Sequence, residues 1–265
     1  MDILQTIIFG LVEGLTEYLP ISSTGHLVIA SSLMGISEDV FVKNFEVIIQ
    51  FGAILAVLAA YPERFRWNFL FYKKIAFAFI PTAIIGFVLK NKVDDWLGSI
   101  HIVAWSLIIG GFVLMACDKV FAPLQTAGRK VEDLTIKDCL LLGLFQSLAI
   151  VPGVSRSGAT IFGGLILGMN KKEAAEFSFF LAVPTIAAAA GYKILRLFMP
   201  HAGTEHLPAW GQQPHPILFL LLGSVISFFV AWVAIRFFIS ILSKYGLKYF
   251  GWYRVVLGSV LLLYF

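Results

Sequence analysis

Hydrophobic residues form six long stretches along the chain, and the polar residues between them are few. The stretches are residues 45–60, 75–90, 102–117, 174–198, 217–241 and 251–265. With their flanks they approach the roughly 17–25 largely apolar residues that a membrane-spanning helix needs. The pattern therefore predicts six transmembrane helices.

Two further apolar stretches, residues 3–35 and 139–169, are interrupted near their middles by clusters of Pro, Ser and Gly. The clusters are PISSTG at 20–25 and PGVSRSG at 152–158. Proline and glycine at these positions end or kink a helix. In hydrocarbon, such a break survives only where protein or a water-filled cavity covers it. We expect each stretch to form a re-entrant helix-loop-helix segment, and a plain kinked span is the alternative.

The two interrupted stretches resemble each other in sequence. GLVEGLTE at 10–17 aligns with GLFQSLAI at 143–150, and SSTG at 22–25 aligns with SRSG at 155–158. This predicts an internal duplication with repeats at 1–118 and 139–265, each containing one re-entrant segment and three spans, within one membrane domain. Since an odd number of spans reverses the direction of insertion, the fold class expected is an all-α polytopic membrane protein with inverted-topology repeats.

Lys and Arg are distributed unevenly between the two sides of this layout. One side holds twelve of them, namely Arg64, Arg66, Lys73, Lys74, Lys119, Arg129, Lys130, Lys137, Lys171, Lys172, Lys244 and Lys248. The other side holds five, namely Lys43, Lys90, Lys92, Lys193 and Arg196. The positive-inside rule then places both termini and the opening of the first re-entrant loop on the outer side of a bacterial cytoplasmic membrane.

Composition supports the membrane prediction and excludes other classes of protein. Hydrophobic residues make up 59% of the 265 residues and charged residues 14%, and the mean hydropathy is +0.87. A soluble protein carries about 25% charged residues, so a water-soluble enzyme is excluded. The net charge of +4 comes without a basic and aromatic groove, so we expect no nucleic-acid partner. Cys117 and Cys139 are interpreted as small buried side chains.

Charged residues within the interrupted stretches need an explanation, because each costs at least about 2.5 kcal/mol on insertion scales. Glu13 and Glu17 lie four apart, which puts both carboxylates on one face of a short helix that ends at Pro20. We interpret them as acid/base groups or as ligands of a divalent cation. The alternative is a pair neutralised by protonation or by a structural partner such as Arg156.

The second interruption has the features of an anion site. Ser155, Arg156, Ser157 and Gly158 directly precede an apolar helix, so hydroxyls, backbone N–H groups, the helix N-terminus and a guanidinium converge there. Arg binds phosphate through two parallel hydrogen bonds, which favours phosphate as the anion. The alternative is that Ser157 only caps the helix and Arg156 only pairs with Glu17.

The first interruption supplies a similar hydroxyl cluster. Ser22, Ser23, Thr24 and Gly25 are predicted to contribute to phosphate binding, and His26 follows as a candidate general base. Glu46 and Gln50, also four apart, are interpreted as either supporting the site or structural.

Taken together, the two halves provide carboxylates, hydroxyls, an imidazole and a guanidinium, which is the set needed for phosphoryl transfer. A site within the membrane favours a substrate with a lipid tail and a phosphorylated head. Three groups remain candidates for attack on phosphorus: the Ser23 hydroxyl, the His26 imidazole and a water molecule.

Three long motifs extend this interpretation. They are EGLTEYLPISSTGH at 13–26, FEVIIQFG at 45–52 and PGVSRSGAT at 152–160. In these motifs, and over nearly its whole length, the chain resembles the BacA/UppP family of bacterial undecaprenyl-diphosphate phosphatases. The resemblance implies hydrolysis of undecaprenyl diphosphate to the carrier lipid for cell-wall synthesis, at the outer side of the cytoplasmic membrane, with bacitracin resistance as a consequence.

The same resemblance implies functional roles for individual residues, namely Glu13, Glu17, Ser23, His26, Ser155 and Arg156. It also implies a dependence on Mg²⁺ or Ca²⁺ and a homodimer. A rival function of another class is a lipid-phosphate flippase or an anion transporter, because inverted repeats with broken helices are also the layout of transporters.

Overall fold

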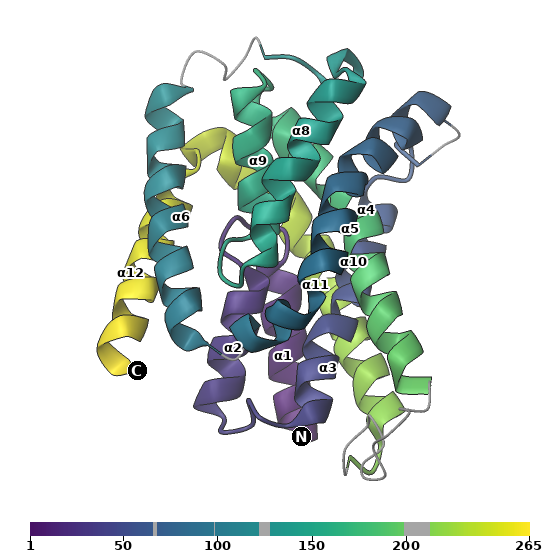
Figure 1. Ribbon diagram of the computed structural model, residues 1–265, viewed down its shortest axis with the longest axis vertical. Coiled ribbons are helices and arrows are strands. Elements are labelled where there is room, and N and C mark those ends of the chain that lie inside the picture. Colours follow the sequence, from purple (N-terminus) through teal and green to yellow (C-terminus); the bar gives the residue numbers. More distant parts are fainter. Residues whose placement is uncertain (66–67, 98, 122–127, 199–212) are drawn as a thin grey trace.

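The computed structural model describes residues 1–65, 68–97, 99–121, 128–198 and 213–265 (Figure 1). Its helices are α1 (Ile3–Thr16), α2 (Ser23–Leu33), α3 (Val40–Ile48), α4 (Gln50–Ala60), α5 (Phe69–Leu97), α6 (Ile100–Val120), η1 (Val131–Asp133), α8 (Ile136–Ser147), η2 (Leu148–Ile150), α9 (Arg156–Ile166), α10 (Lys171–Phe198), α11 (Pro216–Tyr245) and α12 (Lys248–Tyr264). The only β-type pairing in these ranges is an isolated bridge between Arg129 and Met169. The all-α prediction is confirmed.

Five helical segments in the described ranges are long and apolar enough to cross a membrane. They are Val40–Ala60, Phe69–Lys90, Ile100–Val120, Lys171–Leu195 and Pro216–Tyr245. Each contains most or all of one predicted span, so the chain is a multi-pass membrane protein. The sixth predicted span, 251–265, coincides with α12, whose 17 residues fall short of the roughly 20 that an untilted crossing needs. That sixth crossing stays a prediction.

Both predicted helix breaks are present. α1 ends at Thr16, and residues 17–22 turn the chain before α2 begins at Ser23. α8 ends at Ser147, and after η2 the chain passes through Pro152 and Gly153 before α9 begins at Arg156. In Figure 1, α1 and α2 lie in the lower half of the molecule and α8 and α9 in the upper half. The two connecting loops meet between them, which brings distant parts of the sequence together.

Small residues permit the close packing of several helices. A Cβ atom on Gly10 would lie 2.9 Å from the Cβ of Ile226, and one on Gly14 would lie 2.7 Å from the carbonyl oxygen of Ser227. α1 therefore packs directly on the backbone of α11, and the four-residue spacing of the two glycines puts both on the contacting face of α1.

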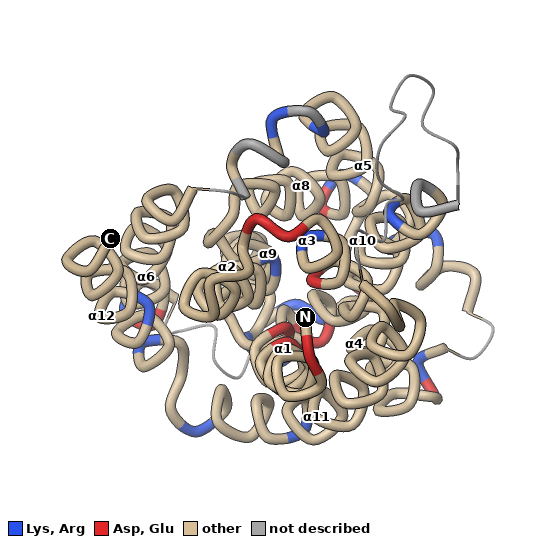
Figure 2. Tube along the Cα trace, turned by 90° about the horizontal axis from the view of Figure 1, so that it is seen from below, with Lys and Arg blue, Asp and Glu red and all other residues tan. Residues whose placement is uncertain are grey.

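The outer surface of the bundle is apolar. Large hydrophobic side chains such as Phe87, Ile109 and Phe229 are at least 60% exposed, and Figure 2 shows how sparse the charged residues are along the chain. Cys117 and Cys139 are free and buried, as predicted. A surface of this kind is stable in lipid and would be unstable in water.

Candidate active site

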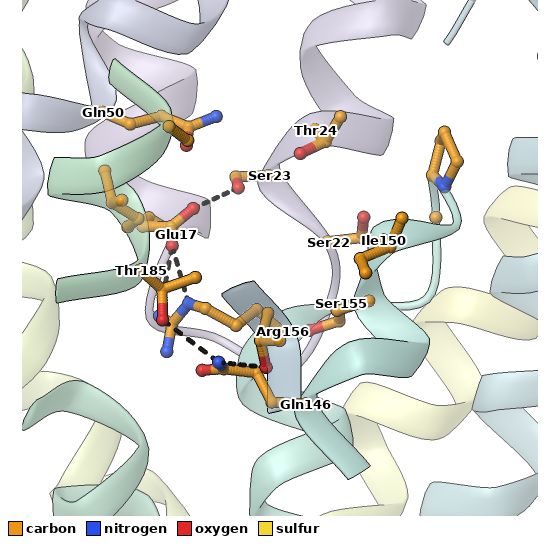
Figure 3. Close-up of a pocket in the computed structure, with 16 residues that line it drawn as sticks. Glu17, Ser22, Ser23, Thr24, Gln50, Gln146, Ile150, Ser155, Arg156 and Thr185 are labelled. Carbon is orange, nitrogen blue, oxygen red and sulfur yellow. Dashed lines mark hydrogen bonds and ion pairs between the residues drawn. The ribbon is translucent and has the colours of Figure 1, made fainter. Parts of the chain in front are cut away.

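A cavity of about 160 Å³ lies where the two loops meet (Figure 3). Its wall is formed by residues of both loops and of α4, α5, α8 and α10, namely Glu17, Ser22, Ser23, Thr24, Gln50, Thr82, Gln146, Ala149, Ile150, Pro152, Gly153, Ser155, Arg156, Thr185, Ile186 and Ala189. Neither interrupted stretch encloses this cavity alone. The two interrupted stretches build one site between them.

Glu17 and Arg156 form an ion pair across the cavity wall. Atoms Nη2 and Nε of Arg156 lie 3.1 Å and 3.3 Å from Oε1 of Glu17. Atom Nη1 of Arg156 lies 2.7 Å from the carbonyl oxygen of Ser178 in α10, which fixes the plane of the guanidinium. Both side chains are nearly buried, at 11% and 6% exposure. A phosphate that entered the cavity would compete with Glu17 for the same guanidinium face.

Glu17 also accepts a hydrogen bond from Ser23. The hydroxyl of Ser23 donates to Oε2 of Glu17, the carboxylate oxygen that does not face Arg156 (Figure 3). The carboxylate is thus placed between a hydroxyl and a guanidinium. A hydroxyl that already donates to a carboxylate is oriented to transfer its proton there if it attacks an electrophile.

The two helices that start at the cavity begin with the same unusual conformation. Ser22 and Ser155 are the two non-glycine residues with positive φ in the described ranges, at 71° and 73°. Each is an N-cap whose hydroxyl accepts from the backbone N–H three residues later, Gly25 at 3.2 Å and Gly158 at 3.1 Å. Such a conformation costs about 1–3 kcal/mol and is found mostly at functional sites. In this arrangement the backbone N–H groups of Gly25 and Gly158 donate to the cap hydroxyls.

The remaining predicted phosphate-binding residues divide into two groups. Ser22, Thr24 and Ser155 line the cavity. The Ser157 hydroxyl instead donates to the carbonyl oxygen of Leu19 at 2.9 Å, so it links the second loop to the first.

His26, the candidate general base, hydrogen-bonds through both ring nitrogens to residues other than Ser23. Its Nδ1 lies 2.7 Å from the carbonyl oxygen of Ser22, and its Nε2 lies 2.7 Å from the hydroxyl of Tyr253. Because a carbonyl oxygen can only accept, Nδ1 carries the proton and Nε2 faces Tyr253. The two rings are stacked at 5.6 Å. The Ser23 hydroxyl donates to Glu17 and not to His26.

Glu13 is fully buried, and both of its carboxylate oxygens lie without a hydrogen-bond partner among the described residues. It is one turn before Glu17, and one carboxylate oxygen of Glu46 is also without a partner there. The described ranges contain no group of three or more His, Cys, Asp or Glu arranged for a metal. A divalent cation that takes two protein carboxylates and completes its shell with phosphate and water oxygens fits this donor set, and the unsatisfied oxygens of Glu13 favour it.

Several residues around the site have no counterpart in the sequence predictions. Gln146 donates to Thr82 at 2.9 Å and to Thr185 at 3.0 Å, which forms a polar wall on one side of the cavity. Arg254 lies behind the two loops, and Tyr253 contacts His26. For Arg254 a signal was available in the sequence, because a lone charge in an apolar stretch needs a reason just as Arg156 does.

Comparison with known proteins shows the family to which the chain belongs. A family model described as bacitracin resistance protein BacA matches residues 6–260. The chain is 58% identical over 263 residues to an undecaprenyl-diphosphatase of Bdellovibrio bacteriovorus, which covers 99% of this chain and 96% of that protein. It is 44% identical over 265 residues to one from Wolinella succinogenes, covering 100% and 98%, and 40% identical over 262 residues to one from Aquifex aeolicus, covering 98% of each. Because the family model matches nearly the whole chain, the chain belongs to the BacA family.

Proposed function

We propose that this protein hydrolyses undecaprenyl diphosphate to undecaprenyl phosphate and inorganic phosphate. The observation that carries the proposal is the contact of Glu17 with both Ser23 and Arg156 inside a cavity enclosed by apolar helices. The names of the relatives support the same substrate. They favour a phosphatase over the flippase or anion transporter, which would need the guanidinium but not the hydroxyl and carboxylate beside it.

Binding begins with the terminal phosphate of the lipid. Arg156 exchanges Oε1 of Glu17 for two phosphate oxygens and keeps its hydrogen bond to the carbonyl oxygen of Ser178. The guanidinium therefore keeps its orientation. The hydroxyls of Thr24 and Ser155 line the same cavity and donate to the remaining oxygens. The prenyl tail lies along the apolar helices.

The chemical step is an attack by the Ser23 hydroxyl on the terminal phosphorus. The new bond joins Ser23 Oγ to phosphorus, the bond to the bridging oxygen breaks, and undecaprenyl phosphate leaves while Glu17 takes the proton. Glu17 passes this proton to the departing undecaprenyl phosphate and is a carboxylate again. It then takes a proton from the attacking water, the bond between Ser23 Oγ and phosphorus breaks, and the proton returns to Ser23 Oγ as inorganic phosphate leaves. A divalent cation held by Glu13 and Glu17 would neutralise negative charge on the phosphates. Direct attack by water, with Ser23 as a hydrogen-bond donor, is the alternative path.

The membrane arrangement is part of the proposal. The two interrupted stretches are re-entrant segments of inverted-topology repeats, supported by the matching caps at Ser22 and Ser155 and by the opposed helix pairs of Figure 1. The side with more Lys and Arg residues faces the cytoplasm by the positive-inside rule. Both termini and the cavity opening are on the other side and therefore face the periplasm. The protein resides in the inner membrane and forms homodimers, as the family resemblance implies.

The proposed activity is tested with purified protein in detergent, where no transmembrane gradient exists. Release of inorganic phosphate from undecaprenyl diphosphate in the presence of Mg²⁺ or Ca²⁺ is expected. A transporter would release none. Labelling of single cysteines from the outside of intact cells tests the orientation, and light scattering of the detergent complex tests the dimer.

A further inference from the structure

Arg254 is a charged residue in the apolar helix α12, and its side chain is 1% exposed. A guanidinium has five N–H donors, and each that remains unsatisfied in such a place is costly. The chemistry proposed above makes no use of it.

All five donors of Arg254 have an acceptor, and every acceptor is a backbone carbonyl. Nε donates to Leu107 at 3.3 Å, and Nη2 donates to Ser106 at 3.0 Å, both in α6. The other three bonds reach the loops, to Pro20 at 3.1 Å, Val154 at 3.0 Å and Gly153 at 2.9 Å. The guanidinium therefore joins α6 and both loops at one point.

The three loop carbonyls belong to residues that are close in the sequence to residues lining the cavity, and Gly153 lines it itself. Pro20 lies between Glu17 and Ser23, and Gly153 and Val154 directly precede Ser155 and Arg156. One side chain thus holds the backbone of both halves of the site. Ser157, through its bond to Leu19, is a second and weaker link between the same loops.

We propose that Arg254 is a positioning residue for the hydrolysis. It fixes the distance between the Ser23–Glu17 half and the Ser155–Arg156 half, so that the attacking hydroxyl and the phosphate-binding guanidinium face one substrate. The proposal rests on the proposed function. A misplacement of about 1 Å can cost about 100-fold in rate, so loss of this link should lower kcat much more than it changes KM.

Two variants weaken the link in different ways. Arg254→Lys keeps the charge, but its three donors cannot satisfy five carbonyls. Gly110→Ala leaves Arg254 in place and puts a methyl group against its Nη2, which displaces the guanidinium. Alanine has a higher helix propensity than glycine, so the change does not weaken α6 itself. Gly191→Ala in α10, where the added methyl meets nothing within 4 Å, is the matched control.

Two readouts are used on purified protein in detergent. The first is amide hydrogen exchange of residues 17–22 and 151–155, which reports on the loops whether or not the protein is active. The second is steady-state phosphate release from undecaprenyl diphosphate. We expect both loops to exchange faster together and kcat to fall about 10- to 100-fold in both variants, with KM changed less than about threefold and Gly191→Ala like the unmodified protein.

Unchanged exchange in Gly110→Ala would overturn the link, and faster exchange with unchanged kcat would overturn its role in positioning. A double variant with Ser157→Ala separates positioning from general destabilisation. If both residues hold the same two loops, their effects on kcat are non-additive, whereas independent effects would add. Failure of the unmodified protein to release phosphate would instead contradict the proposed function, and hydrogen exchange would still decide whether Arg254 holds the loops.

Discussion

Ser22 and Ser155, 133 positions apart in the chain, have nearly the same left-handed backbone, with φ of 71° and 73°. Each hydroxyl caps the helix that it precedes, and each is followed three residues later by glycine. Both turns face one cavity, and each directs the side chain that follows it. That side chain is Ser23 after the first turn and Arg156 after the second.

Arg156→Lys tests the guanidinium. The ammonium keeps the charge but cannot bond to Ser178 and to two phosphate oxygens in one plane. We expect kcat to fall about 100- to 1000-fold while the thermal midpoint in detergent stays close to that of the unmodified protein. Arg236→Lys, in which the changed residue lies over the ring of Trp232 in α11, is the control. Near-normal phosphate release by Arg156→Lys would remove the proposed role in phosphate binding.

Glu13→Gln tests the divalent cation without touching the contacts of Ser23. If Glu13 and Glu17 hold the cation together, the variant should need at least about tenfold more Mg²⁺ or Ca²⁺ for half-maximal activity. Glu17→Gln should show the same shift together with a slower maximal rate, because it also loses the proton acceptor. Glu38→Gln, at an exposed ion pair with Lys43, should leave the metal titration unchanged. An unaltered metal titration in Glu13→Gln would point to proton transfer or to a structural role for this residue.

The attacking group is decided by stereochemistry at a chiral thiophosphoryl centre. Attack by Ser23 followed by water gives two displacements and therefore retention, and Ser23→Ala should then lower kcat by about 1000-fold or more. Inversion would exclude every covalent intermediate and favour direct attack by water. Retention combined with an active Ser23→Ala enzyme would identify His26 as the nucleophile, despite its contacts with Ser22 and Tyr253.

Asp138 should make stability depend on pH. It lies outside the candidate spans and, although burial opposes its ionisation, the hydrogen bonds from Arg129 and Thr135 hold its pKa below the usual value. A lowered folded-state pKa stabilises the protein above the unfolded value of about 3.9, and this contribution is lost as the pH falls through the folded value. Between pH 5 and pH 3 the thermal midpoint should therefore fall further in the unmodified protein than in Asp138→Asn. Equal falls would show that the interaction contributes nothing.

The sequence was sufficient to predict the two helix breaks, whereas the pairing of Glu17 with Arg156 was predicted only as an alternative to their roles in metal and phosphate binding. α5 and α10 continue through Pro81 and Pro184, so it is the combination of proline with serine and glycine at 20–25 and 152–158 that predicts a break. A charge buried in an apolar stretch needs a partner, and the contact of Glu17 with Arg156 at 3.1 Å satisfies this requirement.

The contacts of His26 and Arg254 could not be predicted in the same way. Both depend on the packing of α12 against α6 and the first loop, which is a contact between residues more than 100 positions apart. Periodicity places a residue on a face of its own helix but does not say which carbonyls that face will meet. Local spacing made Ser23 and His26 look like partners, whereas the turn at Ser22 directs them to different neighbours.

The contacts of Arg254 also have a consequence for biosynthesis. Because α12 follows both loops in the chain, Ser23, Glu17 and Arg156 are all synthesised and inserted before the residue that links their backbones exists. A nascent chain that has not yet delivered α12 would contain every group proposed for the chemistry and still lack a fixed site. Packing of α12 against the two loops is therefore the step at which a growing chain acquires the geometry of the proposed site, and chains that end before α12 should be inactive toward undecaprenyl diphosphate.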